Sequence, residues 1–149
     1  DTGVTALETL QGTSPLQIGT FPGTKFQFHA SALGKVALAF GPPEVLKRAL
    51  RSERASFTAR TNTDADWLVG EIEKARRNGW AVAPEENLIG INSLAAPVFQ
   101  ADGNLAGAIA AVDSIQFLAP EPAEKQIACV TGVAAKISAE LGYIRPRQG

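Results

Sequence analysis

The stretch "HASALGKVALAF", residues 29–40, changes the chain from an extended pattern to a helical one. Apolar residues within it recur at the spacing of one helical face: Leu33, Val36, Ala37 and Phe40. Ser31 stands where an N-cap residue belongs, because its hydroxyl can accept a hydrogen bond from a free N–H of the first turn. The stretch therefore predicts a helix that begins after Ser31 and stops before Gly41.

The residues on either side of this helix predict short strands and a second helix. Residues 4–10 and 14–21 carry β-branched and apolar residues broken by glycines, which is typical of short strands joined by turns. Pro43 suits the first turn of a helix, and an apolar stripe follows it: Val45, Leu46, Ala49 and Leu50. Residues 52–62 are polar and show neither period, so we interpret them as a connection.

Further along, the chain predicts a third helix and three strands. Thr63 with Asp66 resembles a capping box, and Gly79 stands at the C′ position of the helix that follows. Strands are expected at residues 80–85, 91–99 and 105–112. The Asp102-Gly103 pair favours a tight hairpin turn, because glycine tolerates the positive φ that such a turn requires.

A last amphipathic helix is expected over residues 121–141. Its buried face should carry Ile127, Val130, Ala134, Ile137 and Leu141. Cys129 on this helix is interpreted as a partly buried, inert thiol. The order of the expected elements indicates one α+β domain over residues 1–149, with an antiparallel sheet and helices packed on it.

Composition and charge limit the class of protein. The chain has 149 residues, of which 45% are apolar, and no apolar run approaches the ~20 residues that cross a bilayer. Fourteen Lys and Arg against 15 Asp and Glu give a net charge of −1, which argues against DNA binding by this chain alone. The single cysteine allows no intrachain disulfide and no segment reads as a secretory leader, so we expect a cytoplasmic protein.

The sequence does not support a nucleotide or metal site. Gly34-Lys35 lacks the earlier glycine of a phosphate-binding loop, and Val36 replaces the Ser or Thr that would bind magnesium. His29 and Cys129 lie too far apart for the usual spacing of zinc ligands. We therefore expect neither a metal nor a cofactor.

Catalytic groups are also sparse. Adjacent residues on a strand point to opposite faces, so Glu85 and Glu86 are expected to be one exposed and one capping or paired carboxylate. His29 and Ser31 lack an acid that would orient them, and His29 is interpreted as a structural histidine that bridges backbone groups. The chain is predicted not to be an enzyme; a small hydrolase that uses His29, Glu85 and Ser93 is the enzymatic alternative.

The start of the helix at Ser31 offers a binding site. The free N–H groups of its first turn, with the helix dipole behind them, suit a carboxylate or another anion. The residues there are small or apolar enough to let a ligand approach the backbone: Ser31, Ala32, Leu33 and Gly34. The other interpretation is that Gly34 and Ala37 only let the helix pack closely on the sheet, and the residues fit both equally well.

Three segments carry a family resemblance: "HASALGKVALA" from His29, "GWAVAPEENLIG" from Gly79 and "SLAAPVFQADGNLAGAIAAV" from Ser93. They resemble the effector-binding domain of the IclR family of bacterial transcription regulators, which carries "HASALGKALLA", "GYAVDDEE", "IAAPVFDADG" and "AAISVSG". The resemblance extends from about Val4 to Leu141. The sequence shows neither the family's DNA-binding winged helix-turn-helix nor the helix and strand that usually open the effector domain. We therefore expect a domain that is incomplete at its N-terminus.

The resemblance implies a GAF-like domain that binds a small effector. In the family, such a domain passes the signal through dimer or tetramer contacts to N-terminal units that bind operator DNA. Pocket positions carried over from the family, together with the helix start, give a predicted effector site: Ser31, Ala32, Leu33, Gly34, Ala83, Ser93, Ala110 and Val112. Residues 52–62 and 86–90 are predicted to be mobile segments that could cover this pocket.

The departures from the family pattern predict the kind of effector. Ala83 stands where many relatives have an acidic residue, and Ala110 and Val112 stand where some have serines. An unpaired buried polar group costs ~1–3 kcal/mol, so this pocket should favour a carboxylate with an apolar or aromatic body. The non-enzymatic alternative is a dimerisation module without a ligand, in which the many alanines of the sheet allow close packing.

Overall fold

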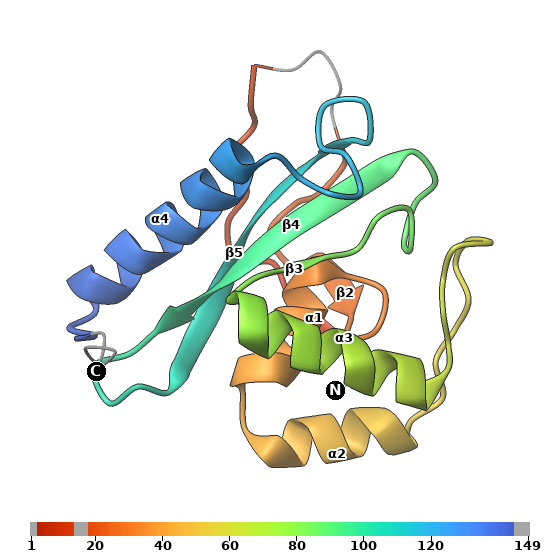
Figure 1. Cartoon of the computed structure of the whole chain (residues 1–149), viewed down its shortest axis with the longest axis horizontal. Coiled ribbons are helices and arrows are strands. Elements are labelled where there is room, and N and C mark those ends of the chain that lie inside the picture. Colours follow the sequence, from red (N-terminus) through yellow and green to blue (C-terminus); the bar gives the residue numbers. More distant parts are fainter. Residues whose placement is uncertain (1–2, 14–17, 145–149) are drawn as a thin grey trace.

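The computed structural model describes residues 3–13 and 18–144. Its elements are, in chain order, β1 (Gly3–Thr5), β2 (Lys25–Gln27), α1 (Ala32–Phe40), α2 (Pro43–Arg51), α3 (Ala65–Asn78), β3 (Ala81–Val82), β4 (Ile91–Phe99), β5 (Leu105–Ser114) and α4 (Glu124–Glu140). Figure 1 shows α4 on one side of the long β4–β5 hairpin and α1, α2 and α3 on the other. The predicted α+β class with antiparallel strands is confirmed.

The main sheet is antiparallel, with the strand order β3-β4-β5. The expected hairpin is present, and Gly103 takes a φ of +83° in its turn. Strand β4 has the predicted bounds and β5 continues to Ser114, two residues beyond the prediction of 105–112. Strand β3 is shorter than the predicted 80–85, because Pro84 has no N–H to donate and Glu85 adopts a φ of +56°.

The prediction of strands at the start of the chain is wrong in extent and position. Only residues 3–5 form β1, residues 18–21 belong to no strand, and residues 14–17 lie outside the described residues. The Thr24 N–H donates to Phe21 O at 3.0 Å, which closes a turn, so the partner strand begins after it as β2. The β2 sequence Lys-Phe-Gln has one apolar residue and gives no strand signal.

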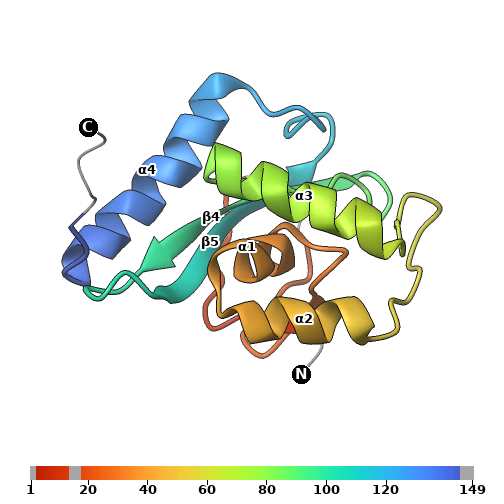
Figure 2. The same ribbon diagram turned by 60° about the horizontal axis from the view of Figure 1, so that its bottom comes forward.

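Helix α1 is the centre of the molecule. Ser31 caps it as predicted, since its Oγ accepts the Gly34 N–H at 3.0 Å. The prediction of a single apolar face is too narrow, because the buried residues surround the helix: Ala32, Gly34, Lys35, Val36, Leu38 and Ala39. The physical reason is visible in Figure 2, where α1 lies between the sheet and the layer of α2 and α3.

Two apolar cores flank the sheet. On one side, Ala95 of β4 packs with α1 and with Leu68 and Ile72 of α3. On the other, the alternate β4 residues Leu94, Ala96 and Val98 pack against Val130 and Ala134 of α4. A fully buried leucine contributes roughly 1.5–3 kcal/mol, so both helical layers hold the sheet in place.

The ends and faces of α3 and α4 differ from the predictions in detail. Asp64, not Thr63, caps α3, because its carboxylate accepts the Trp67 N–H at 2.7 Å; Gly79 is left-handed at the C-cap as predicted. On α4, Ser138 takes the inward position expected for its neighbour Ile137. Its hydroxyl donates to Ala134 O and accepts the Phe99 N–H, which fixes the helix against β4.

Helix α4 begins three residues later than the predicted 121, and three side chains on it or at its C-cap are more exposed than the periodicity predicts. They are Ile137, Leu141 and Cys129, which was expected to be partly buried. Once Val130, Ala134 and Ser138 define the buried face, these positions turn to solvent.

Replacing Gly34 by alanine should destabilise the domain by about 1–3 kcal/mol, because an added Cβ would lie 2.5 Å from the backbone of Phe28. Gly70 on α3 has open space around its Cβ position, so Gly70→Ala should raise the unfolding free energy by roughly 0.5–1 kcal/mol through helix propensity. Urea unfolding of both variants checks this. Equal stabilities for Gly34→Ala and the native chain would contradict the close approach of α1 to Phe28.

Candidate functional site

A cavity of about 210 Å³ lies beside the start of α1. Its apolar lining consists of Ile18, Phe26, Ala30, Leu33, Ala83, Leu88, Ile91 and Val112. Its polar lining consists of Thr20, Thr24, Ser31, Asn87, Asn92 and Ser93, with Gly19 beside them. None of these lining residues carries a charge. The cavity is large enough for a small organic molecule, since a cavity of roughly 150 Å³ already holds benzene.

The structure brings most of the predicted effector residues to this cavity. Those that line it are Ser31, Leu33, Ala83, Ser93 and Val112. Ala32 is fully buried behind them, Gly34 packs against the Phe28 backbone, and Ala110 packs against the core around α1. Of the two interpretations of Gly34, close packing is therefore the one that its surroundings support.

The polar groups at the helix start are only partly free. The Gly34 N–H is taken by Ser31, whose own hydroxyl donates to Gln27 O at 2.8 Å. The Ala32 N–H reaches Ser93 Oγ at 3.4 Å, which is a long hydrogen bond. Within residues 3–13 and 18–144, the Leu33 N–H makes no hydrogen bond. Among the polar groups at the helix start, the Leu33 amide and the Ser93 hydroxyl therefore keep the most hydrogen-bonding capacity.

Asn92 lines the cavity but orients Ser93 instead of offering a free amide. Its Oδ1 accepts the Ser93 N–H at 2.8 Å, and its Nδ2 donates to the carbonyls of Leu118 and Ala119. These contacts hold the start of β4 against the segment that leads to α4. Asn92 therefore acts as a fixed support, which the sequence did not reveal.

Sequence reasoning missed one wall of the cavity, the segment 18–26, which folds back over the helix start. It also named no individual lining residue in the loop after β3, although Asn87 and Leu88 line the cavity. Of the two segments predicted to cover the pocket, residues 86–90 do border it, while no residue of 52–62 is among its described lining. Residues 18–26 reach the cavity because of the turn at Phe21–Thr24. Apolar periodicity does not predict where that turn places them.

Comparison with known proteins identifies the family. The family described as "Bacterial transcriptional regulator IclR C-terminal" matches residues 1–139. This chain belongs to the IclR family of bacterial transcriptional regulators. The glycerol operon regulatory protein of Streptomyces griseus is 34% identical over 122 residues, or 80% of this chain and 48% of that protein. The regulator BhcR of Paracoccus denitrificans is 34% identical over 129 residues, or 85% and 45%.

Solved structures agree with this assignment. The Thermotoga maritima IclR structure has a TM-score of 0.78 and 31% identity, covering 90% of this chain and 55% of that one. An IclR homologue from Microbacterium hydrocarbonoxydans, complexed with 4-hydroxybenzoate, has a TM-score of 0.83 at 24% identity, over 94% and 56%. The chain spans about half the length of the curated relatives it matches, in agreement with a C-terminal domain.

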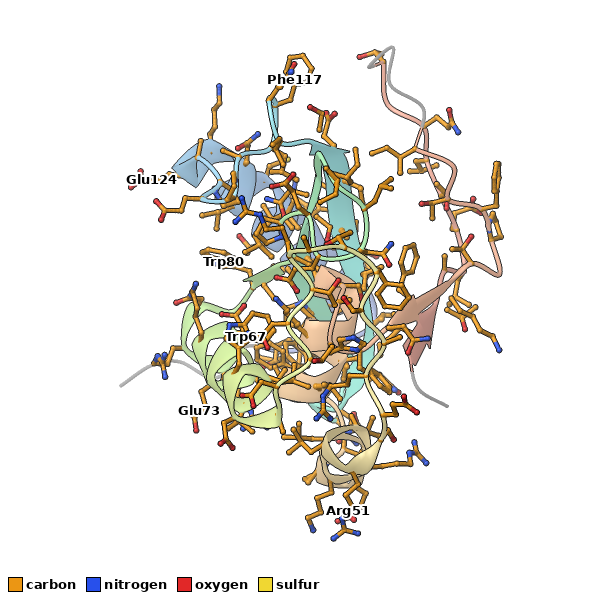
Figure 3. The ribbon with its side chains drawn as sticks, turned by 90° about the vertical axis from the view of Figure 1, so that its right-hand side faces the viewer. Arg51, Trp67, Glu73, Trp80, Phe117 and Glu124 are labelled. Atoms are coloured by element: carbon orange, nitrogen blue, oxygen red, sulfur yellow. The ribbon has the colours of Figure 1, made fainter. Side chains whose placement is uncertain are left out.

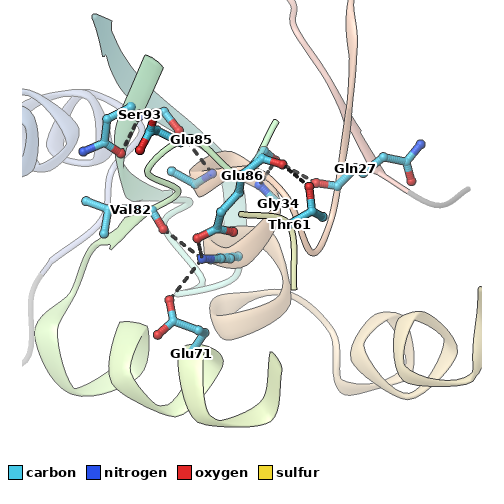
Figure 4. A network of polar contacts seen from close by, with 12 residues as sticks. Gln27, Gly34, Thr61, Glu71, Val82, Glu85, Glu86 and Ser93 are labelled. Carbon is cyan, nitrogen blue, oxygen red and sulfur yellow. Dashed lines mark hydrogen bonds and ion pairs between the residues drawn. The ribbon is translucent and has the colours of Figure 1, made fainter. Parts of the chain in front are cut away.

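Next to the cavity, this IclR-family domain buries a charged cluster (Figure 4). Lys35 of α1 has a fully buried side chain, and its Nζ donates to Glu86 Oε1 at 2.8 Å, Glu71 Oε2 at 3.0 Å and Val82 O at 3.0 Å. The same Nζ lies 4.8 Å from the centre of the Trp67 ring, which Figure 3 shows between α3 and α1. A lysine is fully buried only when it is paired, and here its three donors are satisfied.

The two neighbouring glutamates differ in environment. Burial raises the pKa of the Glu86 carboxyl above its ordinary value of 4.5, and the Lys35 ammonium opposes this shift. Glu86 is thus the paired member that the sequence predicted. Glu85 is not the exposed member, because it is half-buried and its Oε1 accepts the Gly90 N–H at 2.9 Å. Both follow β3, so the alternation of a strand does not govern them.

His29 is a structural residue in its contacts. Its ring is 3% exposed, Nε2–H donates to Ala55 O at 2.8 Å, and the ring stacks on Phe57 with centroids 6.0 Å apart. Its described hydrogen bonds include none to Ser31, whose hydroxyl donates to Gln27 O instead. The pair therefore lacks the contact between base and nucleophile that a hydrolase needs.

Within residues 3–13 and 18–144, no helix is both long and apolar enough to cross a membrane. Over the same ranges, no cluster of His, Cys, Asp and Glu side chains is arranged to hold a metal ion.

The stability of the domain should fall below pH 6.5 because of His29. Burial lowers its pKa from 6.5, helped by the charges of Arg54 and Lys35 and opposed by the bond to Ala55. The unfolded chain then binds the proton more tightly, so the contribution of neutral His29 is complete above pH 6.5 and is lost as the pH falls toward the folded pKa.

Urea unfolding at pH 7.5, 6.5 and 5.5 should show this loss, at most about 1.4 kcal/mol between pH 6.5 and 5.5. His29 is the one histidine of the sequence, so the difference between the native chain and His29→Gln isolates its titration. Identical pH slopes in the two proteins would show that the pKa of His29 is not lowered on folding.

Proposed function

We propose that this domain binds a small carboxylic acid with an apolar or aromatic body in the cavity beside α1. The observation that carries the proposal is a cavity with a mostly apolar lining to which Leu33 and Ser93 contribute, residues whose backbone N–H and hydroxyl respectively keep hydrogen-bonding capacity. A helix N-terminus favours negative charge, and apolar walls favour a ligand body that displaces water.

The neutral lining supports a preference among acids. A very small, polar acid would leave the walls formed by Leu33, Ala83 and Val112 without contact. Such an acid would also lose its hydration on entering the cavity, and no cationic side chain among the described lining residues would compensate for that loss. The Microbacterium homologue was solved with 4-hydroxybenzoate, an acid with an aromatic body.

We further propose that ligand binding regulates DNA binding by another part of the full regulator. The family assignment supports this role, and the net charge of −1 does not suggest that the chain holds DNA itself. A ligand can shift such an equilibrium only by its differential affinity for two arrangements of the protein. Self-association would supply the second arrangement, and it would cover exposed apolar side chains of α4 such as Val133 and Ile137.

The other functions receive less support. A ligand-free dimerisation module would have a filled pocket, whereas the cavity here has about 210 Å³ of free volume. A hydrolase would need His29, Glu85 and Ser93 to act together, but their described side-chain hydrogen bonds do not join them. The His29 ring bonds to Ala55 O, the Glu85 carboxylate accepts the Gly90 N–H, and the Ser93 hydroxyl accepts the Ala32 N–H while its backbone N–H donates to Asn92.

Thermal unfolding with a panel of acids tests the proposal. At a hundredfold excess over Kd, benzoate, 4-hydroxybenzoate or hexanoate should add ~2.7 kcal/mol, which raises Tm by several degrees. Glyoxylate at the same concentration should have a smaller effect. Stronger stabilisation by glyoxylate than by every larger acid would contradict the predicted preference.

Removing the Ser93 hydroxyl should weaken the binding of the most effective acid by about fivefold to tenfold, equivalent to roughly 1 kcal/mol. Thr131→Ala is the matched control, since it also removes a hydroxyl but lies on α4 and does not line the cavity. Titration calorimetry of both variants gives the comparison. An unchanged Kd in Ser93→Ala would remove this hydroxyl from the site.

A further inference from the structure

The segment of residues 85–91, which ends at the first residue of β4, forms one wall of the cavity, and of its side chains only that of Glu86 is buried. Asn87, Leu88 and Ile91 line the cavity, while the Leu88 and Ile89 side chains are 55% and 58% exposed. Glu85 adopts a φ of +56°, which is unfavourable for a residue with a Cβ. Apolar burial and backbone preference therefore do not hold this wall, and polar contacts must do so.

Three polar contacts anchor the first residues of the loop. Thr58 Oγ1 donates to Glu85 O at 2.7 Å and Thr61 Oγ1 donates to Glu86 O at 2.6 Å. The Glu86 carboxylate pairs with Lys35 of α1 at 2.8 Å. Figure 4 shows Glu86 between Thr61 on one side and Val82 and Glu71 on the other. The loop is thus fixed to α1 and to the connection before α3.

The ion pair is the most buried of these anchors. The Lys35 side chain is 0% exposed and that of Glu86 is 6% exposed, and the Glu86 Oε2 atom has no hydrogen-bond partner among residues 3–13 and 18–144. Burying a carboxylate with one unsatisfied oxygen is unfavourable, so the Lys35 ammonium is what keeps Glu86 in this buried position. Its position next to Asn87 gives the ion pair a direct effect on the cavity wall.

Glu71 provides an internal comparison. It contacts the same ammonium at 3.0 Å, but it lies on α3 and its side chain is 21% exposed. Neither glutamate lines the cavity, and only Glu86 belongs to the loop that does. The two carboxylates thus share a charge partner and differ in what they anchor.

We propose that Glu86 is a positioning residue for ligand binding, because its ion pair with Lys35 holds residues 85–91 in place as a wall of the cavity. The part that concerns ligand affinity rests on the proposed function of the cavity. The anchoring itself does not depend on that function and is measurable without a ligand.

Amide hydrogen exchange of the ligand-free chain tests the anchoring. The reporters are amides whose hydrogen bonds define the loop: Glu85, Gly90, Ile91 and Ile115. In Glu86→Gln they should exchange at least roughly tenfold faster than in the native chain, because local opening then lacks the buried pair. The central amides of β4 should change much less.

Glu71→Gln is the matched control, since it removes one negative charge beside the same ammonium. It should leave the exchange of the four loop amides within about threefold of the native rates. Equal acceleration in both variants, or a uniform rise over β4 and the loop, would reduce Glu86 to a general stabilising role and overturn the proposal. Should Glu86→Gln fail to fold, Glu86→Asp retains the charge on a shorter side chain and should loosen the same four amides.

Calorimetric measurement of benzoate binding tests the effect of the ion pair on ligand affinity. Glu86→Gln should weaken Kd at least about tenfold, or about 1.4 kcal/mol, and Glu71→Gln by less than about threefold, or about 0.7 kcal/mol. Faster loop exchange with an unchanged Kd would show that the loop is anchored but does not position the ligand. If neither benzoate nor any other acid of the panel binds the native chain, the proposed function fails, and the exchange result stands as a separate finding.

Discussion

The fully buried ammonium of Lys35 is the interaction on which the arrangement around the cavity depends. It joins α1 to Glu71 of α3, to the carbonyl of Val82 in β3 and to Glu86 in the following loop. A buried cation without these acceptors would be strongly unfavourable, so the four elements must keep their relative positions for the charge to stay inside. The pair acts as a constraint on geometry more than as a source of net stability.

This constraint also explains why the cavity can be neutral. The charged groups gather on the side of α1 that faces α3, whereas Leu33 and Ser31 face the cavity from the first turn of the same helix. Two adjacent turns of α1 therefore serve different purposes. The first turn presents backbone and apolar surface to the cavity, and Lys35 in the next turn holds Glu86, which precedes the lining residue Asn87.

Much of the fold follows from local signals in the sequence. The start of α1 at Ser31, the proline that opens α2, the left-handed Gly79 and the bounds of β4 are each set by residues next to them, and each was predicted. The failures depend on distant contacts. No local signal indicates that Lys35 is buried, because only the approach of two glutamates from other elements makes its burial possible.

The candidate site divides in the same way. Ser31, Leu33, Ala83, Ser93 and Val112 reach the cavity as expected, because a helix start and sheet alternation fix their directions. The segment 18–26 was missed, since a turn brings it there. The loop 86–90 was predicted to border the pocket, but its lining residues Asn87 and Leu88 were not named. Ala110 lies on the same face of β5 as Val112 but packs against the core around α1 and does not line the cavity.

The hydrogen bonds of the connection 52–62 place it outside the cavity but in contact with two of its walls. Ala55 O receives the His29 N–H just before the helix start, and Thr58 and Thr61 hold the loop on the other side. A ligand that moved either wall would strain these bonds, so the connection would shift with the loop as one unit. Signals from a neutral cavity could thus reach the outer surface through a segment that never touches the ligand, provided that the two arrangements differ in ligand affinity.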